Sequence, residues 1–351
     1  MADIRIAQGR LSEAMHTYEQ ALQLAREHGT PTLRGTADMY VGMSGVFRER
    51  NELAAARQAL SSSTELGEHA GLAQNPYRSR VAMARIVAAE GDVDGAVALL
   101  DEAERVYAGD YFPNVRPIPA SRARLWVVQG RVSEALAWVD EQGLSTKDDL
   151  RYMKEFEHIT LARVLLAGSD QPRAEAMAFL ERLREAAEGG ERSGSVIEIL
   201  VLQALAHQKR GDTAAALVPL GRALALAEPE GYVRMFVDEG PPMAVLLGAT
   251  AKGEIASTYA RELLAAFGDA AHPASARQDL VEPLSQRELD VLRLLASDLN
   301  GPAIANELVV SLNTVRSHTK SIYSKLGVND RRGAVRRAEE LDLLSRGRRR
   351  P

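Results

Sequence analysis

A short motif recurs through the first two thirds of this 351-residue chain with a period of about 40 residues. In each copy, a residue at a turn position is followed five positions later by an alanine near the start of an apolar stretch with helical periodicity. These alanines are Ala14, Ala56, Ala96, Ala135, Ala176 and Ala216, with spacings of 42, 40, 39, 41 and 40 residues. A repeat this regular restricts the fold to an array of similar units, each packed on its neighbours.

The composition of each copy predicts a pair of antiparallel helices. Glycine at the turn position tolerates the left-handed conformation that ends one helix, and an aspartate or serine soon after it can cap the next. In the first copy, one helical face carries Ala14, Tyr18, Ala21, Leu22 and Ala25. Such a pair cannot bury its apolar face alone, so we predict an all-α fold in which the pairs stack into a solenoid. The pattern resembles tetratricopeptide repeats, although its period exceeds their usual ~34 residues.

The sequence changes character near Ala227, after the sixth copy. Residues 228–243 contain prolines and glycines that break helices, and a last apolar helix is expected to extend to about Phe267. Residues 268–282 lack periodicity and are rich in small residues, as is typical of a linker. We therefore predict a TPR-like solenoid over residues 1–267, a linker over residues 268–282 and a separate domain over residues 283–351.

The beginning of the chain does not fit a complete array. Only eight residues precede the first turn at Gly9, too few for the first helix of a pair. Because a solenoid normally ends in a capping repeat, we expect that the chain starts within a repeat and forms the C-terminal part of something longer.

Composition excludes several classes of protein. There is no cysteine, which excludes disulfides, thiolate metal sites and cysteine nucleophiles. The seven histidines are scattered without metal-ligand spacing, so no metal site is expected. No apolar run approaches the ~18 residues of a membrane span, and the N-terminus lacks the layout of a signal peptide. We expect a cytoplasmic protein without membrane association.

Charge is unevenly distributed along the chain. Residues 281–351 contain 13 Lys and Arg against 9 Asp and Glu, a net charge of +4, whereas the rest of the chain carries −9. Residues 314–337 contain seven basic residues and only one acidic residue, Asp330. A basic module joined to an acidic body is typical of a protein in which one domain approaches a polyanion.

The basic module has the sequence signals of four helices. Ser285 and Glu288 can form a capping box before a helix that buries Leu289, Leu292, Leu295 and Ala296. A short helix follows Gly301-Pro302, a third extends from Ser311 to about Lys325, and a fourth begins at Asn329 or Asp330. A short helix, a tight turn and a longer basic helix form the layout of a helix-turn-helix DNA reader.

Residues 283–344 closely resemble the LuxR family of regulators. The resemblance rests on Leu284-Ser-Gln-Arg-Glu-Leu-Asp-Val-Leu-Arg-Leu-Leu, on Ile304-Ala-x-x-Leu, on Val310-Ser-Leu-Asn-Thr-Val-Arg-Ser-His and on Ile322-Tyr-Ser-Lys-Leu-Gly-Val, followed by Arg331 and Ala334-Val335. Two departures stand out: Ala303 replaces the family's usual glutamate, and Asp342 stands where glycine often ends the last helix. The repeats and residues 231–243 resemble the large MalT-like members, in which an ATP-binding domain precedes the repeats.

The resemblance implies roles for individual residues. Base-reading positions fall on Arg316, Ser317 and Lys320, and the two cations share one helix face from which they could reach guanine O6 and N7. Phosphate contacts are expected from Asn313, Thr314, His318, Lys325 and Arg331. The fourth helix often forms the dimer contact in this family, which assigns that role to Val335, Ala338 and Leu341.

No enzymatic site or cofactor is expected. Gly248-Ala-Thr-Ala-Lys-Gly-Glu has the glycine spacing of a P-loop, but it places Glu254 where lysine must meet phosphate, and we interpret it as a helix break. No Ser-His-Asp order or paired-carboxylate signal occurs elsewhere.

The sequence therefore predicts a regulator of transcription that binds double-stranded DNA as a homodimer, with a solenoid that receives a signal. The resemblance favours activation over repression, and leaves open a small-molecule inducer or protein partner on the solenoid and a contact with RNA polymerase. The alternative is a ligand- or protein-binding scaffold, a truncated regulator that does not bind DNA on its own.

Overall fold

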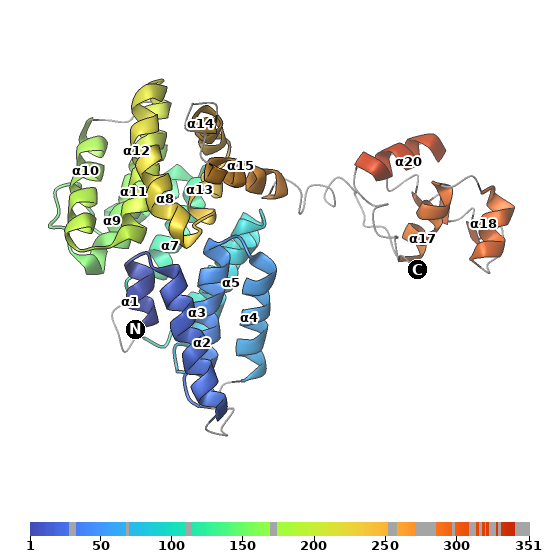
Figure 1. Cartoon of the computed structure of the whole chain (residues 1–351), viewed down its shortest axis with the longest axis horizontal. Helices are drawn as coiled ribbons and strands as arrows, with labels where there is room; N and C mark the ends of the chain where they lie inside the picture. The colour runs from blue at the N-terminus through green and yellow to red at the C-terminus, as the bar shows by residue number, and fades with distance from the viewer. Residues whose placement is uncertain are drawn as a thin grey trace. The chain divides into compact units, whose positions relative to one another are not determined.

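The computed structural model describes residues 1–27, 33–67, 70–109, 114–168, 174–251, 258–270, 286–296, 299–308 and 331–340, together with residues 314, 315, 318, 319, 321, 322 and 328. The chain forms two compact units, Met1–Ala270 and Ala271–Pro351, which are described separately (Figure 1). All regular elements in the described residues are helices, as the all-α prediction requires. Of the predicted linker over residues 268–282, the first three residues belong to helix α15, which ends at Ala270, and residues 271–282 lie outside the described ranges.

The first unit begins with six helical pairs, one for each copy of the motif. The pairs are α1 (Ala2–Ala7) with α2 (Leu11–Glu27), α3 (Thr36–Glu49) with α4 (Leu53–Glu65), α5 (Asn75–Ala89) with α6 (Val93–Arg105), α7 (Ile118–Val128) with α8 (Val132–Glu141), α9 (Glu155–Ala167) with α10 (Ala174–Gly189), and α11 (Ser193–Lys209) with α12 (Thr213–Ala227). The residues before Gly9, expected to be too few for a first helix, form the six-residue helix α1. Helices of successive pairs pack against one another, as α2 does on α3 and α10 on α11 (Figure 1).

The six motif alanines lie at the helix contacts, as their spacing predicts. Five of them are completely buried, and Ala176 is 3% exposed. Because alanine has the smallest apolar side chain, the helices of a pair can approach closely at these positions. The turns before them are left-handed where described, with positive φ at Gly9, Asn51, Gly91, Gly130 and Gly211. At Gly9 space is also limiting, because a Cβ there would lie 2.8 Å from the backbone nitrogen of Gly194.

Side-chain caps fix the start of two of the second helices. The carboxylate of Asp92 accepts a hydrogen bond from the backbone N–H of Gly95 at 2.8 Å, and Asp212 accepts from Ala215 at 2.9 Å. Both aspartates come directly after the turn glycine, which confirms the predicted capping role.

The segment after α12 returns to the beginning of the unit. It contains η2 (Glu228–Glu230), α13 (Arg234–Val237), α14 (Pro241–Ala251) and α15 (Thr258–Ala270). The prediction of one last apolar helix was therefore wrong, because α14 and α15 are separate helices. The helix break predicted over Gly248–Glu254 falls partly on residues 252–254, which lie outside the described ranges. The backbone N–H of Val233 donates to the carbonyl of Glu49 at 2.8 Å, and Arg50 Nε donates to the carbonyl of Glu230 at 3.2 Å. These bonds join segments about 180 residues apart in sequence.

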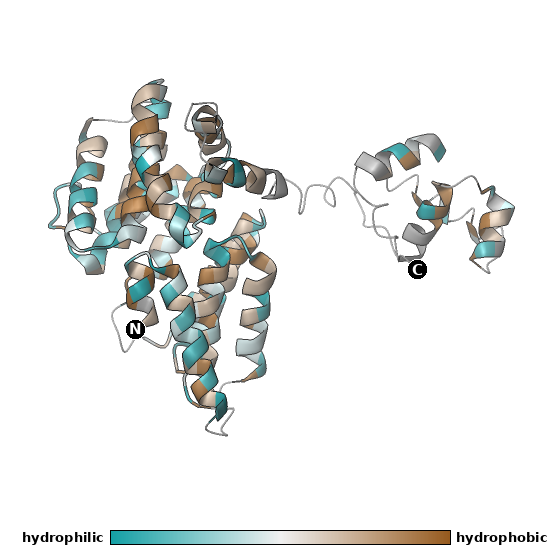
Figure 2. Ribbon diagram, in the orientation of Figure 1, coloured by the Kyte–Doolittle hydropathy of each residue, from teal (hydrophilic) through white to brown (hydrophobic). Residues whose placement is uncertain are grey.

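Hydrophobic and polar residues alternate along the same helices in both units (Figure 2). This is the pattern of amphipathic helices that bury one face against their neighbours. Among the described helices, none is both long and apolar enough to cross a bilayer.

The motif alanines give a direct test of the packing. We expect Ala96→Leu to lower the free energy of unfolding by about 1–3 kcal/mol, because the contact between α5 and α6 at this completely buried position has no room for a larger side chain. Ala98→Leu is the matched control, since Ala98 is exposed on the same helix. Chemical denaturation of both variants measures the difference, and equal stability would contradict the assigned contact.

Candidate nucleic-acid interface

The second unit is built around one small apolar core. The described helices are α17 (Gln286–Leu295), α18 (Gly301–Glu307) and α20 (Arg331–Glu340), and residues 314–315, 318–319 and 321–322 are also helical. Nine buried residues form the core: Val291, Leu292, Leu295, Ile304, Ala305, Val315, Ile322, Ala334 and Ala338. Every helical segment of the unit contributes to it, so the helices hold one another in place. Ala296, predicted to be buried, is exposed because α17 ends at Leu295.

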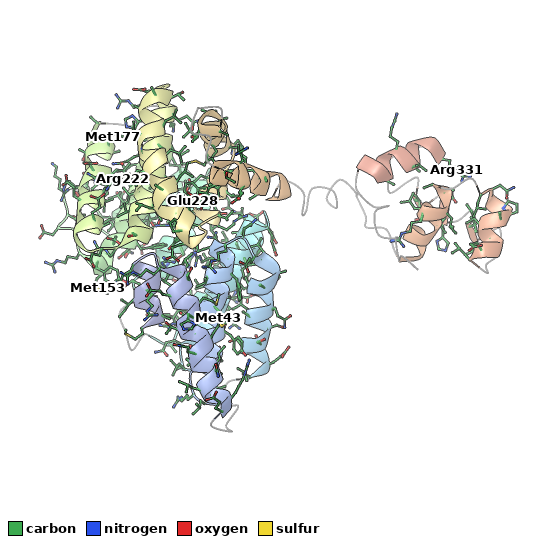
Figure 3. All side chains as sticks on the ribbon, in the orientation of Figure 1. Met43, Met153, Met177, Arg222, Glu228 and Arg331 are labelled. Atoms are coloured by element: carbon green, nitrogen blue, oxygen red, sulfur yellow. The ribbon has the colours of Figure 1, made fainter. Side chains whose placement is uncertain are left out.

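Two polar interactions position these helices, and the sequence analysis predicted neither. The side chain of Asn300 accepts a hydrogen bond from the backbone N–H of Ala303 at 3.0 Å and so caps α18. The N-cap preference of asparagine, one residue before Gly301-Pro302, is the signal that could have revealed it. Arg331, labelled in Figure 3, donates from Nε to the carbonyl of Leu295 at 2.8 Å and joins the start of α20 to the end of α17.

Some of the predicted site residues lie in the described part of the unit. Thr314 and His318 are in helical segments and are partly buried. Arg331 carries the hydrogen bond to Leu295 in addition to its expected phosphate role. Val335 is partly buried on α20, while Ala338 is completely buried in the core. The other predicted site residues lie outside the described ranges, namely Asn313, Arg316, Ser317, Lys320, Lys325 and Leu341.

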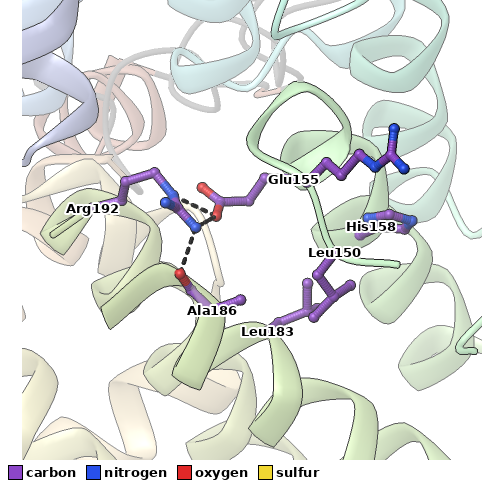
Figure 4. A pocket seen from close by; sticks show the side chains of 7 residues that line it. Leu150, Glu155, His158, Leu183, Ala186 and Arg192 are labelled. Carbon is purple, nitrogen blue, oxygen red and sulfur yellow. Dashed lines mark hydrogen bonds and ion pairs between the residues drawn. The ribbon is translucent and has the colours of Figure 1, made fainter. Parts of the chain in front are cut away.

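The first unit contains a second candidate site, a pocket between α9, α10 and the start of α11 (Figure 4). Its empty volume of about 190 Å³ includes open solvent, and is below the ~300 Å³ of a typical ligand pocket. Its charged groups engage one another: Glu155 accepts from Arg192 Nε at 2.7 Å, and Arg192 also donates to the carbonyl of Ala186 at 2.7 Å. His158, 2% exposed, contacts Asp148 at 3.2 Å. These contacts tie α9 to its neighbours.

Comparison with known proteins agrees with this architecture. Residues 1–253 match the family described as MalT-like TPR region, and residues 282–338 match the bacterial regulatory proteins of the luxR family. The chain is 26% identical over 367 residues to the HTH-type transcriptional regulator MalT of Yersinia pestis (strain Pestoides F), and 25% identical over 364 residues to that of Serratia proteamaculans (strain 568). Each alignment covers 97% of this chain and 40% of the relative.

The chain thus spans about 40% of the length of these relatives. The two matched families follow one another in the same order as the solenoid and the helix-turn-helix unit. The chain therefore belongs to the MalT-like group of LuxR-family helix-turn-helix transcriptional regulators.

Proposed function

We propose that this regulator binds one specific DNA sequence as a homodimer, reading the major groove with the helix that contains residues 314–322. The observation that carries the proposal is the shared core of the second unit. Val315 and Ile322 of this helix are 3% and 0% exposed and pack with α17, α18 and α20. These two residues therefore anchor one face of the helix, and we propose that the opposite face contacts DNA.

Helical periodicity supports the choice of base-reading residues. With roughly 100° of rotation per residue, a helix anchored at Val315 and Ile322 directs positions 316, 317 and 320 away from the anchored side. Arg316 and Lys320 can then donate to guanine O6 and N7, the commonest specific contact in the major groove. Asn313, Thr314, His318 and Lys325 are proposed to contact phosphates, which add affinity without sequence information.

We further propose that α20 mediates dimerisation on DNA. Val335 is the described residue best suited to the contact, because it remains partly exposed, whereas Ala338 supports the helix from the core. Leu341 would extend the same surface. A twofold dimer requires an inverted-repeat site with half-sites about one helical turn apart.

The acidic solenoid is proposed to receive the signal, from a small molecule or a protein partner, in the cytoplasm. Its net charge of −9 up to residue 280 disfavours contact with DNA. Activation through a contact with RNA polymerase is the proposed outcome.

We expect Arg316→Ala and Lys320→Ala each to weaken binding to the selected site by about 1–3 kcal/mol, or roughly 5- to 150-fold, because each removes a direct base contact. Selection of genomic DNA fragments by the purified chain, across a salt series, would first identify the site. Arg222→Ala is the control, because it removes one positive charge from the solenoid instead of the DNA-binding unit. Glu188, the partner of Arg222, still pairs with Arg184 in this variant.

Two outcomes of this experiment would contradict the proposal. Unchanged affinity of both variants would exclude the assigned reading face. Weak, steeply salt-dependent binding without a sequence motif would favour a scaffold that does not read DNA on its own.

A further inference from the structure

Three arginines recur with the period of the repeats on the first helices of successive pairs. They are Arg85 on α5, Arg124 on α7 and Arg163 on α9, spaced 39 residues apart, and each follows a buried alanine. Since equivalent positions of stacked repeats face the same side of a solenoid, these arginines line one surface. That surface lies on the inside of the unit, where the segment 232–239 also packs.

At one end of this surface, three arginines share two carboxylates. Glu49 Oε1 accepts hydrogen bonds from Arg48, at 3.1 Å, and from Arg85. Asp238 forms ion pairs with Arg48 and with Arg234. Arg234 is 4% exposed and donates in addition to the carbonyl of Ala89 at 3.0 Å. The Nε atoms of Arg48 and Arg234, and Oε2 of Glu49, find no hydrogen-bond partner among the described residues.

At the other end, two arginines share two carboxylates in a chain of contacts. Glu198 Oε1 accepts from Arg124 Nη1 at 2.7 Å and from Arg163 Nε at 2.9 Å, and Arg163 also pairs with Glu239 at 2.7 Å. Arg124 additionally donates from Nε to Thr160 Oγ1 at 2.8 Å and lies 3.7 Å from the centre of the Phe156 ring. This group is neutral overall.

Arg116 lies near both groups. Its guanidinium lies 5.7 Å from the same Phe156 ring and forms no ion pair with a described residue. It is near enough to influence the pKa values of Glu49, Arg85 and Arg124. At the rim, Arg50 donates to the backbone carbonyl of Glu230 and to the hydroxyl of Ser12.

Among the described residues, the surface therefore carries six arginines and four carboxylates, a surplus of two positive charges. The arginines are Arg48, Arg85, Arg116, Arg124, Arg163 and Arg234; the carboxylates are Glu49, Glu198, Asp238 and Glu239. Burying charge without a partner is costly.

The pKa values of two arginines reflect this surplus. Burial together with the neighbouring Arg48 and Arg116, incompletely offset by Glu49, lowers the pKa of Arg85 to about 10. Burial lowers the pKa of Arg124 to about 9. Glu198 acts to raise this pKa, but the positive charges of Arg163 and Arg116 act to lower it. Both side chains still reach solvent: 34% of Arg85 and 20% of Arg124 is exposed, and Arg116 is exposed.

We propose that Arg85, Arg116 and Arg124 form a binding site on the inner surface of the solenoid for a small doubly charged anion, a phosphate ester or a dicarboxylate. Guanidinium groups suit this chemistry, because their planar donors match the oxygens of both anions in a bidentate way. Two negative charges would neutralise the surplus. Use of the anion as a regulatory signal rests on the proposed function, but its binding does not.

A small ligand fits this surface better than an acidic peptide. The chain's own segment 232–239 already occupies part of the inside, with Val233 bonded to Glu49, and Asp238 and Glu239 paired with Arg48 and Arg163. An extended peptide along the arginines would have to displace this segment and its ion pairs.

Isothermal titration calorimetry of the full chain without DNA tests the site, with inorganic phosphate and succinate as probes at constant ionic strength. At least one probe is expected to bind, and their relative affinities distinguish a phosphate site from a carboxylate site. Arg116→Gln and Arg85→Gln should each weaken binding about tenfold or more, by loss of a charge-assisted contact. Arg80→Gln is the matched control on α5, since Arg80 faces Glu102 and belongs to neither group.

Thermal stability separates a ligand contact from a structural role. Arg116→Gln removes an unpaired charge, so the ligand-free variant should be at least as stable as the parent while binding is lost. Failure of both probes to bind, or unchanged affinity in both variants, would overturn the proposal. Loss of binding in Lys320→Ala would also overturn it, because the anion would then lie in the basic unit. Tighter binding of a decaglutamate peptide than of either probe would indicate a peptide groove instead.

Discussion

Replacing Glu198 with glutamine is expected to lower the free energy of unfolding of the solenoid by about 3–5 kcal/mol. The carboxylate is 8% exposed and accepts hydrogen bonds from Arg124 and Arg163 on two different helices. Glutamine preserves the volume but leaves both guanidinium groups short of a negative charge in a partly buried position. Chemical denaturation monitored by circular dichroism measures the loss.

The pH dependence of stability identifies the charge as the cause. Burial alone would raise the pKa of Glu198, but Arg124 and Arg163 outweigh it and hold the pKa at about 2. Since an unfolded glutamate titrates near 4.5, the contribution of this carboxylate is complete above that pH and is lost as the pH falls from about 4.5 towards 2. The difference in the free energy of unfolding between the parent protein and Glu198→Gln should therefore decrease as the pH falls below about 4.5.

A matched control is Glu134→Gln, which removes a carboxylate paired with Arg131 on the exposed surface of α8. Solvent screens this pair, so no measurable change in stability is expected. If Glu134→Gln and Glu198→Gln were equally stable, the ion pairs of Glu198 with Arg124 and Arg163 would not hold the helices together.

The local architecture of the solenoid could be predicted from sequence because its determinants are local. The turn residue and the buried alanine of each copy are five positions apart, and where an aspartate caps the helix it lies between them, as Asp92 does before Ala96. The inner ion pairs could not be predicted in the same way. Arg48 with Asp238, and Arg124 with Glu198, join residues that are 190 and 74 positions apart, and only the curvature of the array brings them together.

The candidate DNA interface was predicted unevenly for a similar reason. Helix periodicity was sufficient to predict the burial of Leu292 and Leu295. It did not predict the bond from Arg331 to the carbonyl of Leu295, because a basic residue near a helix start is equally compatible with solvent, phosphate and a neighbouring carbonyl. The base-reading residues were assigned by resemblance, and stay a prediction until DNA binding is measured.

Replacing Leu292 with alanine is expected to unfold the helix-turn-helix unit while leaving the solenoid intact. Leu292 is completely buried among Val291, Ile304 and Ala334 on three helices. Loss of a buried leucine side chain costs about 2–5 kcal/mol, which is comparable to the total stability of roughly 3–9 kcal/mol expected for a domain of this size. Differential scanning calorimetry should therefore show that the transition of the helix-turn-helix unit is lost or moves to a much lower temperature, while the transition of the solenoid is unchanged. Specific DNA binding should disappear.

The partly buried Leu294 provides the control on the same helix, and Leu294→Ala should have a smaller effect on the same transition. The form of the melting curve decides how the two units are related. A single transition that shifts as a whole in Leu292→Ala would mean that the solenoid and the DNA-binding unit unfold together, which would contradict a separate domain over residues 283–351. Two independent transitions would instead mean that a signal on the solenoid must act on DNA binding through a contact or through dimerisation, because the stability of one unit would not depend on the other.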